Sequence, residues 1–228
     1  MPMQAAEKRK LEQEKMKAAR IEHIVECTFD LFSENGIESI TMNEIAEEAE
    51  IGVATLYRYF STKEDLAIEV AIYAWRMEEE TFRKVFSSEA YDKMNGYDQL
   101  KVLLGVFPTA LVSQSRFFRF IYYFDSFVKK ESVMPERLDK YEGAIVNMKN
   151  VVMNALEKGK KDGSITYHTK NAEISDASDD EMYFALMHSL FALAQKLSLS
   201  GEMLFMDREV QPRKQMELMV SLILSALK

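Results

Sequence analysis

Residues 41–60 read T-M-N-E-I-A-E-E-A-E-I-G-V-A-T-L-Y-R-Y-F and carry the strongest structural signal in this 228-residue chain. Thr41 and Glu44 have the spacing of a capping box, which predicts the start of a short helix. Residues 50–52 then form a tight turn, and a second short helix is expected over 53–59. Two short helices joined by a turn of three or four residues form a helix-turn-helix.

Helical patterns continue on both sides of this motif. Upstream, Ile24 and Phe32 fall on one face of a helix, which Asn35-Gly36 is expected to end with a left-handed cap. Downstream, the expected helices cover 63–86, 96–113 with a bend at Pro108, 114–130, 135–161, 179–199 and 212–227. A polar loop is expected over 163–178.

Composition favours an all-α protein. Only 8 glycines and 4 prolines interrupt the chain, and 47% of its residues are hydrophobic, which suffices for a packed core. The expected organisation is a charged extension over 1–19, a three-helix helix-turn-helix domain over 20–66, and a larger domain of about nine helices over 67–228. The long helix that links the two domains is expected to face inward with Leu66, Val70, Tyr73 and Met77.

The sequence contains no candidate residues for several kinds of active site. Cys27 is the single cysteine, so neither a disulfide framework nor a multi-cysteine metal site is expected. His23, His168 and His188 lie far apart without ligand spacing, and we find no Gly-rich phosphate loop or nucleophile motif. No apolar stretch is long enough to cross a bilayer, and the N-terminus is charged from the start. We therefore expect a cytoplasmic protein that is not an enzyme and needs no cofactor.

The motif and its flanks resemble the N-terminal domain of the TetR family of bacterial regulators. The matching residues are Thr41, Ile45-Ala46 with Ala49, Thr55-Leu56-Tyr57-Arg58-Tyr59-Phe60, and Lys63-Glu64-Asp65-Leu66. Together with Thr28 to Phe32 and Asn35-Gly36-Ile37, the resemblance covers about residues 20–70. It implies a DNA-binding transcriptional regulator whose C-terminal domain dimerises and binds a small-molecule effector.

The resemblance also implies which residues contact DNA. Phosphate contacts are expected from Thr41 or Met42, from Tyr57 and from Lys63. Base edges are expected to meet Gly52, Val53, Ala54, Thr55, Arg58 and Tyr59. Arg58 is the best candidate for direct readout, because a guanidinium can pair bidentately with guanine. The sequence departs from the family at Glu50, where glycine is common and a strained turn is expected, and at Val53, where many members carry a polar or basic residue.

The charge of the expected DNA-binding region is acidic. The chain has a net charge of −8, and residues 1–65 hold eight basic and fourteen acidic residues, a net charge of −6. The acidic residues of the first helix and of 44–50 are expected to face away from DNA. The basic cluster in 8–20 is either an arm that reaches the backbone or minor groove, or a solvated extension of the first helix.

The C-terminal domain carries no motif that places an effector, so its candidates come from pattern alone. Segment 114–130 is apolar all round and should be central, and together with 15 methionines in the chain its aromatic residues would suit an apolar or aromatic effector. The candidate ligand contacts are Trp75, Arg116, Phe120, Tyr123, Phe124 and His188. For each of them taken singly, an ordinary core or surface role is the preferred explanation.

Helices 179–199 and 212–227 are expected to form a homodimer. The candidate interface residues are Met182, Ala185, Leu186, Ser189, Leu193, Met216, Val220 and Ile223. A dimer would place two recognition helices about one DNA turn apart, so the double-stranded operator should be palindromic. The expected function is a repressor released from DNA by its effector. The alternative is a helical ligand-binding or protein-interaction dimer without sequence-specific DNA binding.

Overall fold

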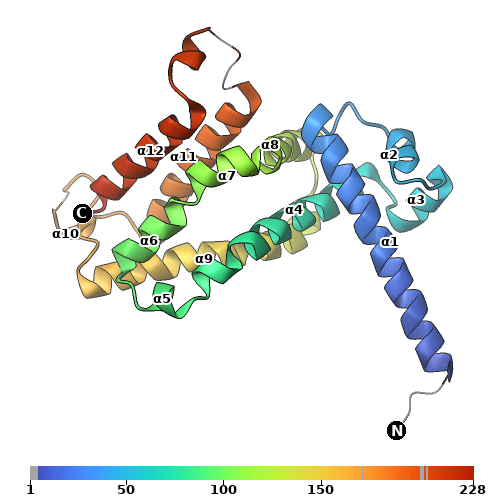
Figure 1. Cartoon of the computed structure of the whole chain (residues 1–228), viewed down its shortest axis with the longest axis horizontal. Coiled ribbons are helices and arrows are strands. Elements are labelled where there is room, and N and C mark those ends of the chain that lie inside the picture. Colours follow the sequence, from blue (N-terminus) through green and yellow to red (C-terminus); the bar gives the residue numbers. More distant parts are fainter. Residues whose placement is uncertain (1–4, 171, 201–202, 204) are drawn as a thin grey trace. The chain divides into compact units, whose positions relative to one another are not determined.

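The computed structural model describes residues 5–170, 172–200, 203 and 205–228, and within these ranges every regular element is a helix (Figure 1). The α-helices are α1 (Ala5–Asn35), α2 (Met42–Glu48), α3 (Val53–Tyr59), α4 (Lys63–Phe86), α5 (Glu89–Asp92), α6 (Gly96–Leu104), α7 (Phe107–Ser113), α8 (Ser115–Lys130), α9 (Asp139–Asp162), α10 (Tyr167–Lys170), α11 (Asp179–Ser200) and α12 (Pro212–Ala226). The 3₁₀ helices are η1 (Pro135–Leu138) and η2 (Phe205–Glu209). The expected all-α class, with three N-terminal helices followed by a larger helical part, is confirmed.

The described chain divides into two compact units. The N-terminal unit takes in residues up to Ala74 together with Tyr123–Tyr141, and the C-terminal unit takes in Trp75–Tyr122 and Glu142–Lys228. Helices α4, α8 and α9 therefore each continue from one unit into the other. The segment Tyr123–Tyr141 belongs to the first unit although more than half of the chain precedes it.

In the N-terminal unit, α1, α2 and α3 share one core. Ile24, Phe32, Ile45 and Leu56 are completely buried, as their inward positions predict. Gly36 has a φ of 81°, and its N–H donates to the Phe32 carbonyl at 3.0 Å, which confirms the left-handed end of α1.

Helix α1 begins far earlier than the apolar pattern indicates. It starts at Ala5, and every side chain from Glu7 to Arg20 is exposed. This basic segment is therefore a helical, solvent-exposed extension of α1. Its basic side chains are accessible to phosphates, and a contact with DNA stays a prediction.

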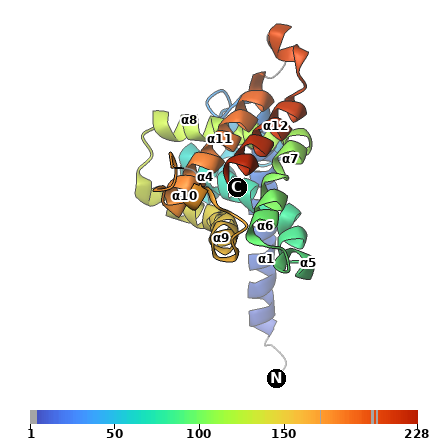
Figure 2. The same ribbon diagram turned by 90° about the vertical axis from the view of Figure 1, so that its left-hand side faces the viewer.

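In the C-terminal unit, α7 packs against both α11 and α12, which run side by side (Figure 1 and Figure 2). The start of α6 meets α9 at a crossing where two glycine backbones touch: a Cβ added to Gly96 would lie 2.0 Å from the Gly159 nitrogen. The Gly96 N–H donates to Asp162 Oδ2 at 2.8 Å, and the Tyr97 N–H donates to Ser164 Oγ at 3.0 Å. These side chains satisfy backbone donors that the first turn of a helix leaves without partners.

Two expectations for this unit are wrong. The helix expected over 96–113 is interrupted at Gly105-Val106, and Pro108 lies in the first turn of α7, where its missing N–H leaves no hydrogen bond unmade. The polar loop expected over 163–178 contains the short α10, and its Tyr167 is completely buried with its hydroxyl 3.4 Å from Asp179 Oδ1. Together with Ile165, which is also completely buried, Tyr167 anchors this connection on the core.

Candidate nucleic-acid interface and effector pocket

Helix α2 begins with the predicted capping box. The Glu44 N–H donates to the Thr41 hydroxyl at 3.3 Å, and the Thr41 N–H donates to a Glu44 carboxylate oxygen at 2.7 Å. The hydrogen bonds from the backbone and hydroxyl of Thr41 lower the pKa of Glu44 below its ordinary value, so this residue is ionised at neutral pH. The first turn of α2 is thus fixed by local contacts.

The turn between α2 and α3 is a Schellman motif. The Ile51 N–H donates to the Ala46 carbonyl at 2.9 Å, and the Glu50 N–H donates to the Glu47 carbonyl at 3.0 Å. Glu50 has a φ of 52°, in the left-handed region that favours glycine. The strain expected at this departure from the family pattern is therefore present in the structure.

Helix α3 presents most of the predicted DNA-contacting side chains on one outer face. Leu56 is completely buried and fixes α3 on the core, which turns Val53, Tyr57 and Arg58 outward. Val53 is 37% exposed and Tyr57 49% exposed. The remaining residues proposed for base contacts are Gly52 and Ala54, which are exposed, and Thr55 and Tyr59, which are half-buried.

Arg58 combines exposure with a defined neighbour. Its guanidinium carbon lies 5.8 Å from the centroid of the Tyr59 ring, within the range of a cation–π contact. Such a contact restricts the long side chain while it leaves the guanidinium donors exposed. This geometry suits a residue that reads a base edge.

Two of the residues proposed for phosphate contacts do not extend their side chains freely into solvent. The Met42 side chain is buried, so Met42 could reach a phosphate only through its backbone N–H. Lys63 is half-buried: its ammonium lies 3.4 Å from the Glu38 carbonyl and about 6 Å from the ring centroids of Phe32 and Phe127. Burial lowers the pKa of Lys63. In this structure the side chain of Lys63 connects the start of α4 to the Glu38 carbonyl.

Segment 123–141 completes the N-terminal unit. Arg137 donates to Asp65 Oδ1 at 2.8 Å and to Thr62 Oγ1 at 3.2 Å, and Lys130 forms an ion pair with Glu38. These contacts join the end of α8 and η1 to the loops on either side of the helix-turn-helix. The two residues of each contact are 72 to 92 positions apart in sequence, so no local pattern predicts these contacts.

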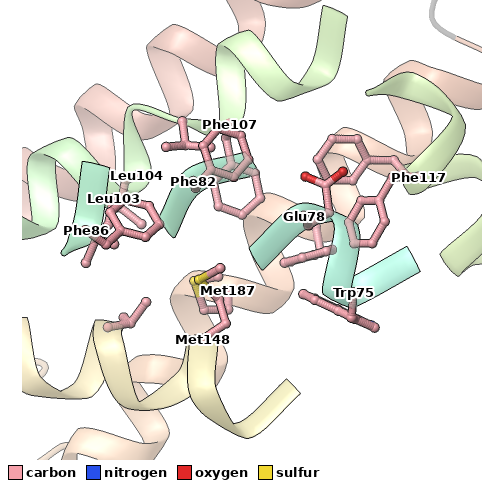
Figure 3. A pocket seen from close by; sticks show the side chains of 14 residues that line it. Trp75, Glu78, Phe82, Phe86, Leu103, Leu104, Phe107, Phe117, Met148 and Met187 are labelled. Carbon is pink, nitrogen blue, oxygen red and sulfur yellow. The ribbon is translucent and has the colours of Figure 1, made fainter. Parts of the chain in front are cut away.

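A largely apolar pocket lies inside the C-terminal unit (Figure 3). The space free of atoms along it is about 530 Å³ when the solvent at its open side is included, and about 60 Å³ of this space can hold the centre of a water-sized sphere. Its lining comes from α4, α6, α7, α8, α9 and α11 and from the residue before α7. The fourteen lining residues are Trp75, Glu78, Phe82, Phe86, Leu103, Leu104, Val106, Phe107, Phe117, Phe118, Met148, Val152, Met187 and Phe191.

Glu78 is the single ionisable side chain in this lining. It is 6% exposed, and burial raises its pKa to about 8. Among the described residues, no side chain or backbone group forms a hydrogen bond or ion pair with its carboxyl group. Figure 3 shows the group surrounded by the apolar lining.

Of the six side chains proposed as ligand contacts, the structure places only Trp75 in the pocket lining. Phe120 and Phe124 are buried core residues, and Arg116 and His188 are exposed. Tyr123 lies in the N-terminal unit, where its ring would be 3.5 Å from a Cβ added to Gly36. The expectation that 114–130 is apolar all round is wrong, because α8 exposes Arg116, Tyr122, Asp125 and Ser126.

The residues proposed for the dimer interface fall into two sets. Met182, Leu186, Met216 and Val220 are buried within the chain itself, because they pack α11 and α12 onto their own unit. Ala185 and Ser189 are exposed, and Leu193 and Ile223 are half-buried. The exposed face of the pair also carries Phe184, His188, Ala192, Leu218, Ser221, Leu222 and Ser225.

Two further observations concern the described residues only. None of their helices combines the length and apolarity needed to span a membrane. Nor do they bring three or more histidine, cysteine, aspartate or glutamate side chains together in a way that could hold a metal ion.

Comparison with known proteins identifies the N-terminal domain by sequence. Residues 24–70 match the family described as bacterial regulatory proteins, tetR family. A helix-turn-helix-type transcriptional regulator of Staphylococcus aureus strain bovine RF122 / ET3-1 is 39% identical over 83 residues, and one of strain USA300 is 36% identical over 83 residues. Each match takes in 36% of this chain and 43% of the relative, so it spans less than half of either protein.

Solved structures share the fold over most of the chain. A TetR transcription regulator from Haloarcula marismortui has a TM-score of 0.67 at 13% identity, covering 92% of this chain and 98% of that one. The fatty acid degradation regulator FadR from Bacillus halodurans has a TM-score of 0.62 at 16% identity, covering 91% and 99%. FadR from Bacillus subtilis, solved in complex with stearoyl-CoA, has a TM-score of 0.57 at 16% identity, covering 90% and 98%. At these identities the likeness concerns the fold alone. The helix-turn-helix and the sequence match over 24–70 identify the N-terminal domain as one of the tetR family of bacterial regulatory proteins, and the rest of the chain shares the fold of the solved TetR-type structures.

Proposed function

We propose that this chain is a homodimeric repressor that binds a palindromic operator and releases it when a small molecule fills the pocket of the C-terminal unit. The observation that carries the proposal is the outer face of α3. There Arg58 is exposed and positioned by Tyr59, while Leu56 fixes the helix on the core. An exposed helix of this kind can enter the major groove, where base pairs present distinct donor and acceptor patterns.

Release by an effector is supported by the course of α4. Its first half, from Lys63, belongs to the N-terminal unit, and its second half supplies Trp75, Glu78, Phe82 and Phe86 to the pocket. A ligand weakens DNA binding only if it binds the DNA-free conformation more tightly than the DNA-bound one. A helix that is part of both units can have a different position in each conformation. The FadR structure with stearoyl-CoA supports the idea that a protein of this fold accepts a small-molecule ligand with a long acyl chain.

Dimerisation is supported by the exposed face of α11 and α12. Leu218 and Leu222 are 58% and 60% exposed, and Phe184 is 44% exposed, although all three are large apolar side chains. Small residues between them, Ala185 and Ser189, would let a second helix pair approach closely. A two-fold dimer through this face would require an operator with two inverted half-sites.

The alternative function is a ligand-binding or protein-interaction dimer that does not read DNA. The net charge of −6 over residues 1–65 favours it, because DNA-binding domains generally have basic surfaces. The four glutamates Glu44, Glu47, Glu48 and Glu50 are exposed within the helix-turn-helix itself. DNA selection separates the two functions directly.

The test is selection of bound sequences from random duplex DNA at low and at moderate salt. A repressor should enrich a palindrome, and Arg58→Ala should then lose about 1–3 kcal/mol of binding free energy and tolerate another base at one position of each half-site. Arg83→Ala is the matched control, since it removes the same charge from an exposed arginine of α4 in the C-terminal unit. No enrichment at either salt concentration would overturn the proposal in favour of the interaction dimer.

A further inference from the structure

The Glu78 carboxyl group makes no hydrogen bond or ion pair within the described part of the chain that would stabilise the fold. It is buried among apolar side chains, and no described residue donates a hydrogen bond to it. A buried polar group without a partner costs free energy, whether it is ionised or protonated. An apolar residue at this position would pack against the same neighbours at a lower cost. This residue is therefore best explained by a partner that enters the pocket from outside.

The surroundings of Glu78 indicate the charge of that partner. Seven of the fourteen lining residues are aromatic, and their ring faces attract cations. The lining contains no lysine, arginine or histidine, so nothing in it would neutralise a carboxylate or phosphate on the ligand. A positive nitrogen would meet both the carboxylate and the rings, whereas its apolar substituents would contact Leu103, Val152 and Met187.

We propose that the effector is a lipophilic cation, an aromatic or alkyl body with one ammonium nitrogen, which binds in this pocket with its nitrogen against the carboxylate of Glu78. The role of the cation as an effector rests on the proposed repressor function, whereas its binding to the pocket does not. Glu78 gives up its proton to solvent as the cation binds, so the complex contains a neutral ion pair. A neutral hydrogen-bond donor on the ligand is the competing partner, and a wild-type chain without any preference for a cation over its uncharged analogue would favour it.

Trp75 provides a direct readout. It is the only tryptophan of the chain and it lines the pocket, so its fluorescence reports on occupancy without any DNA. The probes are the para-tert-butylbenzyl-trimethylammonium ion and its uncharged analogue, in which carbon replaces the nitrogen. The two have nearly the same shape, and the permanent charge of the first does not depend on pH.

The wild-type chain should bind the cation about tenfold or more tightly than the neutral analogue. Glu78→Gln keeps the shape of the side chain and removes its charge, so it should abolish this preference and leave the affinity for the neutral analogue within about twofold. Glu80→Gln is the matched control: it removes an exposed carboxylate from the same helix and should change neither affinity. The far-ultraviolet circular dichroism and melting temperature of each variant verify that it folds.

Three results would overturn the inference. These are equal binding of cation and analogue to the wild-type chain, an unchanged cation affinity in Glu78→Gln, and no binding of either probe up to its solubility limit. The result is separate from that for the repressor function. If DNA selection fails and the cation binds, the pocket assignment stands without the repressor. If a palindrome is enriched and the cation does not bind, the repressor stands and its effector belongs to another class.

Discussion

Glu50 holds a backbone conformation that suits glycine better than glutamate. Its φ of 52° places it in the left-handed region, which costs a residue with a Cβ about 1–2 kcal/mol. Glu50→Gly should therefore raise the free energy of unfolding by about 1 kcal/mol, less than the full strain because glycine also loses more entropy on folding. Urea denaturation of both proteins measures this change in the free energy of unfolding. Glu50→Gln is the control, since it removes the charge and keeps the strain; an equal gain from Gln would assign the effect to charge.

Glu78 should make the stability of the chain fall with rising pH. Its pKa is about 8 in the folded chain and near 4.5 when unfolded, so between these values the folded state holds a proton that the unfolded state has lost. Glu78→Gln should be more stable than wild type, by a margin that widens by up to about 1.4 kcal/mol per pH unit between about pH 5 and 8 and is constant above. Denaturation of both proteins across this range checks the slope. A margin independent of pH would mean that Glu78 is ionised throughout.

At the scale of elements, the crossing of α6 and α9 depends on Gly96. A Cβ there would lie 2.0 Å from a backbone nitrogen, which no side-chain rotation can relieve. Gly96→Ala should cost about 2–3 kcal/mol of unfolding free energy, because the two helices must move apart. Gly143→Ala in α9 is the matched control. Nothing lies within 4 Å of its added Cβ, so this change should stabilise the helix by about 0.5–1 kcal/mol. Equal effects of the two substitutions would show that the crossing is not tight.

The elements that sequence predicts well are those stabilised by neighbours in the chain. The capping box of α2 and the left-handed end of α1 involve residues three or four positions apart, and both occur as expected. The bounds of α4 agree with the periodicity as well. The pocket combines residues of six helices, so no local pattern places it. For the same reason nothing near residue 123 indicates that 123–141 joins the N-terminal unit.

The inner face of α4 shows why an apolar pattern does not reveal its key polar residue. The pattern predicts Leu66, Val70 and Met77 inward, but Met77 is 48% exposed and Glu78 is buried instead. A search for hydrophobic residues counts an acidic residue as surface. A signal was present, because Trp75, Glu78, Phe82 and Phe86 follow one another at intervals of three and four residues on one helical face. An acid inside such a series is a candidate ligand contact.

At the scale of the whole molecule, the exposed face of α11 and α12 should hold two chains together. Leu222 is 60% exposed, so Leu222→Glu should leave the fold of the single chain intact. In a dimer it would bury two unpaired carboxylates against each other, which costs several kcal/mol and should shift the protein to a monomer. Sedimentation equilibrium measures the change. Val85→Glu, at another exposed apolar position, is the control and should leave the assembly unchanged. A monomeric wild type, or a dimeric Leu222→Glu, would place the interface elsewhere.

Coupling between the pocket and the operator is a property of the whole molecule, and thermodynamics makes it reciprocal. If the lipophilic cation weakens operator binding by a given factor, the operator must weaken cation binding by the same factor. We expect a factor of about 5–150, the usual range of such coupling, measured once by DNA titration with saturating cation and once by Trp75 quenching with saturating operator. Glu78→Gln should lower the affinity for the cation in both conformations and leave operator binding without ligand unchanged, since it acts at the pocket alone. Equal cation affinities of the free and operator-bound protein would show that the cation occupies the pocket without regulating the repressor. A ligand that binds two conformations equally well does not shift the equilibrium between them.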